Sequence, residues 1–293
     1  MIVLFGAGGQ LGQEVVGHAR RIGAPLSAFD RRKADITDRN AVARAINRPG
    51  VELVINAAAY TKVDQAESEP DQAFAVNATG ATVVAEACAE AGLPLIHIST
   101  DYVFDGNADY AYREDEPIAP LGVYGRSKAA GEDAVRQHNP NHVILRTAWV
   151  YGVYGKNFLK TVLRLAAEQD ELRIVADQWG APTSTEDLAA AIFRIRSKCA
   201  GAPWGTYHFT GAGKTTWQGF ASRVVEAQAR FTGRHPRVTA IATAEFASKA
   251  KRPVNSVLDT AHFAAVFGLS AAPWQQAVDR TVVKLLSGSR DDT

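Results

Sequence analysis

Tyr124 and Lys128 lie four residues apart in a stretch whose helical pattern continues through Ala134. Residues at this spacing share one face of a helix, so a phenol and an ammonium can point into the same cleft. Free tyrosine titrates near pH ~10, and a neighbouring cation lowers that pKa toward the range useful for acid–base catalysis. We therefore predict that Tyr124 exchanges a proton and that Lys128 lowers its pKa. The alternative is an exposed helical pair without a catalytic role, because this spacing is common.

Thr100 follows directly after an apolar run, Leu95–Ser99, that has the pattern of a buried strand. Ligands of parallel α/β sheets bind outside the carboxyl ends of the strands. We expect the Thr100 hydroxyl to donate a hydrogen bond to a reacting carbonyl and to stabilise the charge that develops when hydride moves. The alternative is that Thr100 only caps the turn that follows.

A glycine-rich loop, GAGGQLG, follows the apolar run Ile2–Phe5, and a helical pattern begins at Gln13. In such a loop Gly6 permits a tight turn, Gly9 lets the backbone approach a pyrophosphate, and Gly12 lets the helix pack against the strand. The sequence therefore predicts a dinucleotide site at this helix N-terminus. A tight strand–helix turn without a ligand is the alternative.

Three residues at the end of the second apolar run bear on the choice of cofactor. Asp30 stands where an acidic residue meets the ribose hydroxyls of NAD, whereas the guanidinium groups of Arg31 and Arg32 can bind the 2′-phosphate of NADP. We expect NADPH, with NADH as the other candidate. A solvated loop is the alternative interpretation of the two arginines.

Short apolar runs alternate with helical patterns through the first half of the chain. The runs are apolar on both faces, which is typical of parallel strands covered by helices on each side. We therefore predict an α/β fold, a doubly wound parallel sheet of the Rossmann type with a smaller substrate-binding lobe. The expected strands are Ile2–Phe5, Leu26–Phe29, Leu53–Asn56, Leu95–Ser99 and Val143–Arg146, and the expected crossover helices include Gln13–Arg21 and Ala78–Ala91.

Beyond Trp149 the pattern becomes irregular, and we expect the chain to pass between two lobes. Residues 1–148 plus about 185–211 are expected to form the dinucleotide-binding domain, and about 149–184 plus 212–293 the substrate-binding lobe. Helices are predicted at Asn157–Glu168 and at Thr185–Lys198, the latter capped by Thr185, and strands at Arg173–Val175 and Gly205–Thr210.

Charge balance and cysteine content limit the classes of partner and location. Lys and Arg total 32 against 31 Asp and Glu, which implies no field-driven affinity for nucleic acid or for an anionic membrane. No apolar run is long enough for a membrane span or a signal peptide, and two cysteines, Cys88 and Cys199, make no disulfide framework. We expect a cytoplasmic protein that binds a small molecule and carries no metal-ligand motif.

Nine segments together resemble the extended short-chain dehydrogenase/reductase family, over nearly the whole chain. Within that family the likeness is to reductases of dTDP-linked 4-keto sugars. The tyrosine–lysine pair marks only the superfamily, whereas STDYVFDG, DQWGAPT and RPVNSVLD are more specific. The segments are GAGGQLG at Gly6, ADITD around Asp35, NAAAYTKVDQAE from Asn56, VNATG around Asn77, STDYVFDG from Ser99, YGRSKAAGE from Tyr124, RTAWVYG from Arg146, DQWGAPT from Asp177 and RPVNSVLD from Arg252.

The resemblance implies reduction of the C4 keto group of dTDP-4-dehydro-L-rhamnose to dTDP-L-rhamnose by NADPH or NADH. Tyr124 would donate the proton, Lys128 would bind the nicotinamide ribose and lower the pKa of the tyrosine, and Thr100 would hold the 4-keto oxygen. Asp101 and Trp149 would face the sugar nucleotide, although a tryptophan beside a strand end is otherwise often part of the core. Besides Tyr124 and Lys128, the residues expected at the cofactor are Gly6, Gly9, Gln10, Leu11, Gly12, Asp30, Arg31, Asp35, Ile36, Ala59, Tyr60 and Thr61.

The resemblance leaves several properties open. A related epimerase or dehydratase would keep NAD bound through turnover, and a regulatory subunit similar to that of methionine adenosyltransferase would keep only the fold. The presence of Tyr124, Lys128 and Thr100 weighs against the regulatory subunit. Arg252 either faces the diphosphate or is structural. Members of the family differ in whether magnesium joins two subunits, so a monomer or a homodimer, with or without Mg, fits the sequence.

Overall fold

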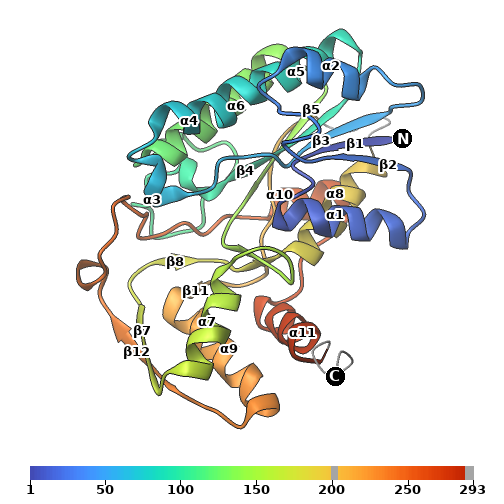
Figure 1. Ribbon diagram of the computed structural model, residues 1–293. Coiled ribbons are helices and arrows are strands. Elements are labelled where there is room, and N and C mark those ends of the chain that lie inside the picture. Colours follow the sequence, from blue (N-terminus) through green and yellow to red (C-terminus); the bar gives the residue numbers. More distant parts are fainter. Residues whose placement is uncertain (199–203, 288–293) are drawn as a thin grey trace.

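The computed structural model describes residues 1–198 and 204–287, which form two lobes (Figure 1). The larger one, the sheet lobe, holds a six-stranded sheet in the order β10-β5-β4-β3-β1-β2. All neighbouring strands in this sheet are parallel. Its strands are β1 (Ile2–Phe5), β2 (Leu26–Phe29), β3 (Leu53–Asn56), β4 (Leu95–Thr100), β5 (His142–Thr147) and β10 (Gly205–His208).

Helices cover both faces of this sheet because its strands are apolar on both sides. In β1, Ile2 and Leu4 pack into one core cluster, whereas Val3 and Phe5 pack into another. The predicted doubly wound parallel sheet is confirmed. The first face is covered by α1 (Gln10–Arg21), α8 (Thr185–Arg196) and α10 (Ala261–Phe267), and the second by α2 (Arg39–Ile46), α5 (Gly80–Glu90) and α6 (Val123–His138) (Figure 1).

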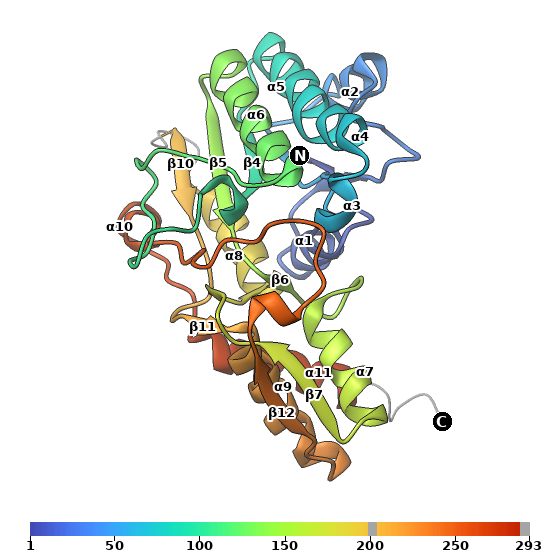
Figure 2. The same ribbon diagram turned by 90° about the vertical axis from the view of Figure 1, so that its left-hand side faces the viewer.

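The smaller lobe, the helical lobe, is built around three helices whose apolar sides share one core cluster. These helices are α7 (Phe158–Glu168), α9 (Trp217–Thr232) and α11 (Trp274–Ser287). Beside them β7 (Glu171–Val175) pairs in parallel with β12 (Arg237–Ile241). Two short strand pairs lie where the lobes meet, namely β6 (Val150–Tyr151) with β9 (Thr183–Ser184) and β8 (Trp179–Gly180) with β11 (Thr215–Thr216) (Figure 2).

The chain passes between the lobes more than once. After β9 it enters α8, which packs on α1, and β10 then joins β5 at the edge of the main sheet. After β12, residues 243–258 run back from the helical lobe to the sheet lobe (Figure 2). Arg252 in this segment forms an ion pair with Asp64 of α3 (Val63–Ala66), with 2.8 Å between Nη2 and Oδ2. The returning segment therefore ties the two lobes together.

Some element boundaries differ from the sequence prediction. α1 begins at Gln10 rather than at Gln13, so the helix starts inside the glycine loop. The prediction that Thr185 caps α8 is wrong, because the Ser184 hydroxyl accepts the backbone N–H of Asp187 and Thr185 is already helical. The helix expected from Ala78 begins as a π-helical turn, Ala75–Thr79, that continues into α5. Cys199 and the tail beyond Ser287 lie outside the described residues.

The described residues also bear on membranes and metals. None of their helices combines the length and the apolarity that crossing a membrane requires. Across residues 1–198 and 204–287, no group of three or more His, Cys, Asp or Glu side chains could hold a metal ion. Cys88 is a buried free thiol, and burial raises its pKa to about 12.

Candidate functional site

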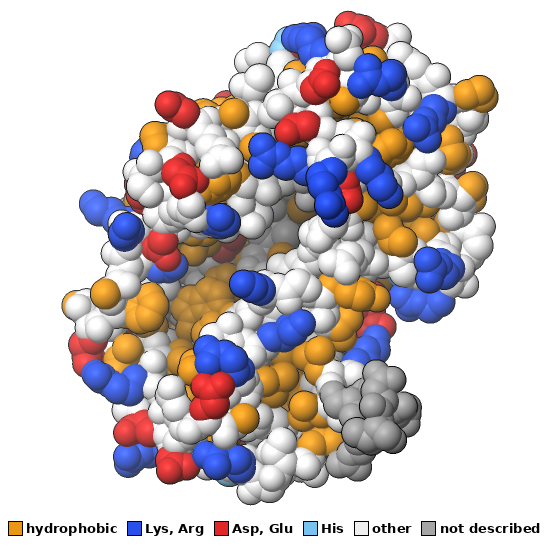
Figure 3. All heavy atoms as spheres, in the orientation of Figure 1, with side chains coloured by type: hydrophobic (Ala, Val, Ile, Leu, Met, Phe, Trp, Pro, Cys, Tyr) orange, Lys and Arg blue, Asp and Glu red, His pale blue; other side chains and the backbone are white. Residues whose placement is uncertain are grey.

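A cavity of about 430 Å³, the loop cavity, lies at the carboxyl ends of β1, β2 and β3, where ligands bind in α/β sheets. The surface is hollowed between the two lobes (Figure 3). Ala57, Ala58 and Val76 line the cavity without having been predicted, since nothing in their residue types signals contact with a ligand. The expected residues that line it are Gly6, Gly9, Asp30, Arg31, Arg32, Asp35, Ile36, Ala59 and Tyr60.

The glycine loop leaves no room for a side chain at two of its positions. A Cβ on Gly6 would lie 2.5 Å from the backbone of Ala57, and Gly6 has a φ of 82°. A Cβ on Gly12 would lie 2.2 Å from the carbonyl oxygen of Gly6, so α1 packs directly on the loop. Gly12 lies outside the lining of the loop cavity, and its absent side chain instead brings the helix N-terminus close to it.

The loop after β2 holds its charged residues in local hydrogen bonds. One oxygen of Asp30 accepts the backbone N–H groups of Arg32 and Lys33, each at 3.0 Å. Arg31 donates from Nε to Asp35 at 3.1 Å, yet its side chain is 71% exposed. Because so exposed an ion pair is weak, the Arg31 guanidinium can exchange Asp35 for the phosphate of a ligand.

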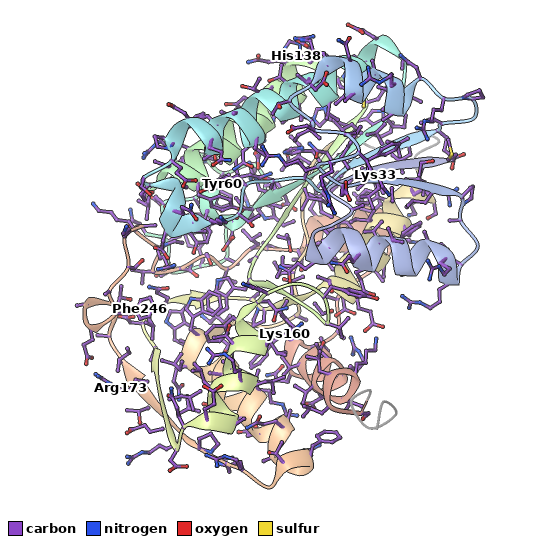
Figure 4. The ribbon with its side chains drawn as sticks, in the orientation of Figure 1. Lys33, Tyr60, His138, Lys160, Arg173 and Phe246 are labelled. Carbon is purple, nitrogen blue, oxygen red and sulfur yellow. The ribbon has the colours of Figure 1, made fainter. Side chains whose placement is uncertain are left out.

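Asn77, which belongs to the VNATG motif, fixes the segment after β3. Its Oδ1 accepts the backbone N–H of Tyr60 at 2.8 Å, and its Nδ2 donates to the Tyr60 carbonyl at 3.1 Å. The same Nδ2 also donates to Ser127 Oγ on α6 at 2.9 Å. Figure 4 shows Tyr60 on the sheet lobe, above the helical lobe that carries Phe246 and Arg173. Asn77 thus joins the edge of the loop cavity to the helix that carries Tyr124.

A second cavity of about 320 Å³, the tyrosine cavity, adjoins the first and shares Gly9, Ala57 and Ala59 with it. Thr100 reaches it from the end of β4, and Tyr124 and Lys128 reach it from α6. The three residues singled out for chemistry therefore line one space. The cavity is also lined by the expected residues Gln10, Leu11, Thr61, Asp101 and Trp149, and by Tyr102, Thr147 and Trp217, which were not predicted.

Tyr124 is held as a neutral phenol. Burial raises its pKa to about 12, the carboxylate of Asp101 acts in the same direction, and the Thr100 hydroxyl, which can donate to the phenolate, opposes the rise. The ring of Tyr102 packs edge-on against it, with centroids 5.6 Å apart. The pKa of Tyr124 therefore lies above its ordinary value, and the expected lowering effect of Lys128 on this pKa stays a prediction.

Lys128 is almost fully buried, with only 2% of its surface exposed. Its Nζ donates to the carbonyl oxygen of Ile98 at 2.7 Å and lies 3.5 Å from Nε2 of His97. Burial lowers the pKa of Lys128 to about 8, and the carboxylate of Glu132 opposes that change. The lysine is therefore poised to gain or lose its charge near neutral pH.

Thr100 caps the single turn of 3-10 helix that follows β4, Asp101–Val103. Its Oγ1 accepts the backbone N–H of Tyr102 at 3.2 Å and donates to Asp101 Oδ1 at 2.9 Å. Thr100 therefore caps this turn, as one interpretation of the sequence expected, and it also lines the tyrosine cavity. Asp101 is buried, and its Oδ2 has no hydrogen-bond partner within the described part of the chain. Burial raises its pKa to about 6, although the hydroxyls of Ser256 and Thr100 favour the ionised form.

Trp149 lines the tyrosine cavity in an uncommon backbone conformation. Its φ of 47° is the one positive value among the non-glycine residues that the structure describes. Backbone strain of this kind costs energy and persists only where the surroundings enforce it. Here the indole is stacked on that of Trp217 from α9, and this stack fixes the orientation of Trp149. No sequence signal pointed to Trp217, because it comes from a distant part of the chain.

A third cavity of about 210 Å³ continues beyond Trp217 into the helical lobe. Arg252 and Phe246 line it, with the guanidinium carbon 5.9 Å from the centre of the phenylalanine ring. Arg252 also donates to Asp64 at 2.8 Å and to the hydroxyl of Ser248. Arg252 therefore has a structural role, because it holds the returning segment, and it also lines a cavity that could receive the diphosphate.

Comparison with known proteins decides the family. The sequence profile of the family described as RmlD substrate binding domain matches residues 1–287. The chain belongs to the RmlD family. Known relatives resemble this chain over nearly its whole length. The dTDP-4-dehydrorhamnose reductase of Sinorhizobium fredii is 41% identical to it, over 99% of each chain. The dTDP-4-dehydrorhamnose reductase of Aggregatibacter actinomycetemcomitans is 42% identical over 94% of this chain and 96% of its own.

Solved structures agree with this place in the RmlD family. The crystal structure of dTDP-4-dehydrorhamnose reductase from Bacillus anthracis, in complex with NADP, superposes with a TM-score of 0.90. It is 36% identical to this chain and covers 97% of it, with 98% of its own length matched. The resemblance to extended short-chain dehydrogenase/reductases is therefore confirmed.

Proposed function

We propose that the chain reduces the C4 keto group of dTDP-4-dehydro-L-rhamnose to the alcohol of dTDP-L-rhamnose, with NADPH as the reductant. As a member of the RmlD family it is a nicotinamide-dependent oxidoreductase. The names of its relatives support the sugar nucleotide as substrate. The NADP complex of the Bacillus anthracis protein supports the cofactor.

The residues of the loop cavity fit a dinucleotide. The close packing at Gly6 and Gly12 exposes backbone N–H groups and the N-terminus of α1, which suit a pyrophosphate. Asp30 is assigned to the adenosine ribose, and Arg31 and Arg32 to a 2′-phosphate. Bound NADPH supplies a hydride to the carbonyl carbon of the substrate. Residues 1–148 plus about 185–211 bind the cofactor in this proposal, and about 149–184 plus 212–293 bind the sugar nucleotide.

In the proposed reaction Tyr124 donates the proton that the carbonyl oxygen needs as hydride reaches the carbon. A pKa of about 12 keeps the phenol protonated at neutral pH, which is the form that a donor must have. The Thr100 hydroxyl turns away from Asp101 Oδ1 and donates its hydrogen bond to the same oxygen. Lys128 binds the nicotinamide ribose, and its positive charge stabilises the phenolate that remains after the transfer.

Asp101 and Trp149 are assigned to the sugar nucleotide. The unpartnered Oδ2 of Asp101 can accept a sugar hydroxyl, and the fixed indole of Trp149 offers a flat apolar surface to one face of the ring. One observation carries the whole proposal. The phenol, the hydroxyl and the ammonium share one cavity, and that cavity is continuous with the glycine loop.

The test follows the absorbance of reduced nicotinamide while purified protein is mixed with NADPH and dTDP-4-dehydrorhamnose. We expect net oxidation of NADPH, and we expect Tyr124→Phe to lower kcat by about 100-fold or more while NADPH affinity is retained. Tyr112→Phe is the matched control, because that phenol is bonded to Asp105 in a separate core cluster. Undiminished turnover by Tyr124→Phe would overturn the assignment of the proton donor. An epimerase or dehydratase would give no net oxidation of NADPH.

A further inference from the structure

Lys128 is the end of a buried chain of side chains that starts at the loop cavity. Nδ1 of His97, on β4, lies 3.3 Å from Nδ2 of Asn56 at the end of β3. Asn56 Oδ1 in turn accepts the backbone N–H of Ala58 at 3.1 Å. Asn56 and His97 are each 1% exposed, so water does not compete for these contacts. The chain therefore runs from Ala58, which lines the loop cavity, to the amine of Lys128.

Asn56 determines which nitrogen of His97 carries the proton. Because Oδ1 of Asn56 is engaged by Ala58, its amide nitrogen faces Nδ1 of His97, and an amide nitrogen can only donate. Nδ1 must then accept, and the ring proton lies on Nε2, facing Nζ of Lys128. A neutral amine can accept that N–H, whereas an ammonium cannot.

Protonation of Lys128 therefore conflicts with this arrangement. An ammonium requires a lone pair on Nε2, which moves the ring proton of His97 to Nδ1. That proton would meet the amide nitrogen of Asn56 unless the amide turned and released the N–H of Ala58. His97 itself cannot resolve the conflict by taking a second proton, since burial and the charge of Lys128 hold its pKa well below its usual range.

We propose that Asn56 and His97 are positioning residues that couple the protonation of Lys128 to the Ala57–Ala59 segment, which contributes to both cavities. Neither side chain lines either cavity, so they act through Lys128 and the backbone. The inference rests on the proposed role of Lys128 at the cofactor. The other groups that face the histidine and the lysine are Glu132 and Arg136 on the same helix and His142 on β5. Tyr124 lines the tyrosine cavity beside Lys128.

Nitrogen-15 NMR of histidine-labelled protein tests the coupling without any substrate. We expect the proton of His97 to lie on Nε2 at pH 10 and to move to Nδ1 as the pH falls and Lys128 gains its charge. In Lys128→Met the proton should stay on one nitrogen across the same range. A single tautomer at every pH in the native protein, or the same change in Lys128→Met, would overturn the proposal. The His97→Gln spectrum assigns the resonance.

A pair of substitutions separates positioning from packing. The amide of glutamine reaches the place of Nε2 and can turn to suit either state of Lys128, whereas the shorter asparagine reaches only the place of Nδ1. We expect His97→Asn to weaken NADPH binding by about tenfold, the size of a lost hydrogen bond to a charged group, and His97→Gln to retain most of the affinity.

His142 provides the control for these substitutions, because it is a buried histidine whose Nδ1 contacts the carbonyl of Asn139 rather than Lys128. His142→Asn and His142→Gln should bind NADPH alike. Equal NADPH affinities of His97→Asn and His97→Gln would show that His97 serves only in packing, and would overturn its role as a positioning residue. If neither variant folds, the NMR measurement on the native protein decides. Failure of the reductase assay alone, with NADPH binding and the tautomer change intact, would instead count against the proposed substrate.

Discussion

The indole ring of Trp149 lies parallel to that of Trp217, with centroids 3.6 Å apart and planes inclined by 9°. Trp149 follows β5 of the sheet lobe, and Trp217 is the first residue of α9 in the helical lobe. Gly180 of β8 also lies against Trp149, because a Cβ there would lie 2.4 Å from the indole. Trp217 is fixed in turn by donating from Nε1 to Gln178 at 3.2 Å. The DQWGAPT segment thus supplies two of the residues that orient Trp149.

Gly180→Ala should therefore weaken binding of the sugar nucleotide. The added methyl group would clash with the indole of Trp149, which must move, and a shift of about 1 Å at a positioning group commonly costs tenfold or more in KM or kcat. We expect KM for the sugar nucleotide to rise about tenfold while NADPH affinity stays within about twofold. Gly17→Ala is the control, since its nearest neighbour, the hydroxyl of Tyr154, is 3.9 Å away. Unchanged KM in Gly180→Ala would show that the stack does not orient the substrate.

The strands could be predicted because their apolar runs are bounded by glycines and polar residues, and helices on both faces require both faces to be apolar. The runs at Ile2–Phe5 and Leu53–Asn56 match the observed strands at both ends. Helix α2 was missed, because its eight residues, RNAVARAI, carry only three buried positions. The start of α1 was misplaced by three residues because the glycines hid the helical pattern.

The candidate site could be predicted where it depends on strand ends and on spacing within one helix. Thr100 and the pair of Tyr124 and Lys128 are of this kind, and all three line one cavity. Trp217 could not be predicted, since its place depends on how the helical lobe packs against the sheet lobe. The rise in the pKa of Tyr124 could not be predicted either, because burial causes it and the sequence does not report burial.

The pH dependence of the reaction should follow the ionisation of Lys128 rather than that of Tyr124. With a pKa of about 8, the lysine loses its charge as pH rises through that value, whereas the phenol, with a pKa of about 12, stays protonated. We expect kcat/KM for NADPH to be level below pH 8 and to fall above it. Lys128→Arg should remove this decline up to pH 10, because a guanidinium keeps its charge there. A decline at the same pH in Lys128→Arg would assign it to another group.

The two arginines after β2 should set the preference for NADPH. Arg31 lies at the edge of the loop cavity in an exposed pair with Asp35, so removing it costs little stability. We expect Arg31→Ala combined with Arg32→Ala to lower the ratio of kcat/KM for NADPH to that for NADH about tenfold, as for the loss of hydrogen bonds to a charged group. Arg39→Ala removes an equally exposed arginine that pairs with Glu86 instead and should leave the ratio unchanged. Equal use of NADPH and NADH by the native protein would refute a dedicated role for Arg31 or Arg32.

Asp101 should make the protein less stable as pH rises from about 4 to 6. Its pKa is raised from 3.8 to about 6, so over this interval the unfolded chain has lost the proton that the folded chain keeps. The unfolded state then binds fewer protons, and the free energy of unfolding falls with pH, by about 3 kcal/mol in total if each pKa unit counts ~1.4 kcal/mol.

Asp101→Asn keeps the shape and the acceptor for Thr100 but cannot ionise. Urea unfolding of the native protein and of this variant, measured from pH 4 to 7, gives the difference in stability directly. We expect the variant to gain on the native protein as pH rises and to level off above pH 6, while KM for the sugar nucleotide increases because a carboxylate acceptor is lost. A constant difference across this range would mean that folding does not raise the pKa of Asp101, which would contradict the prediction.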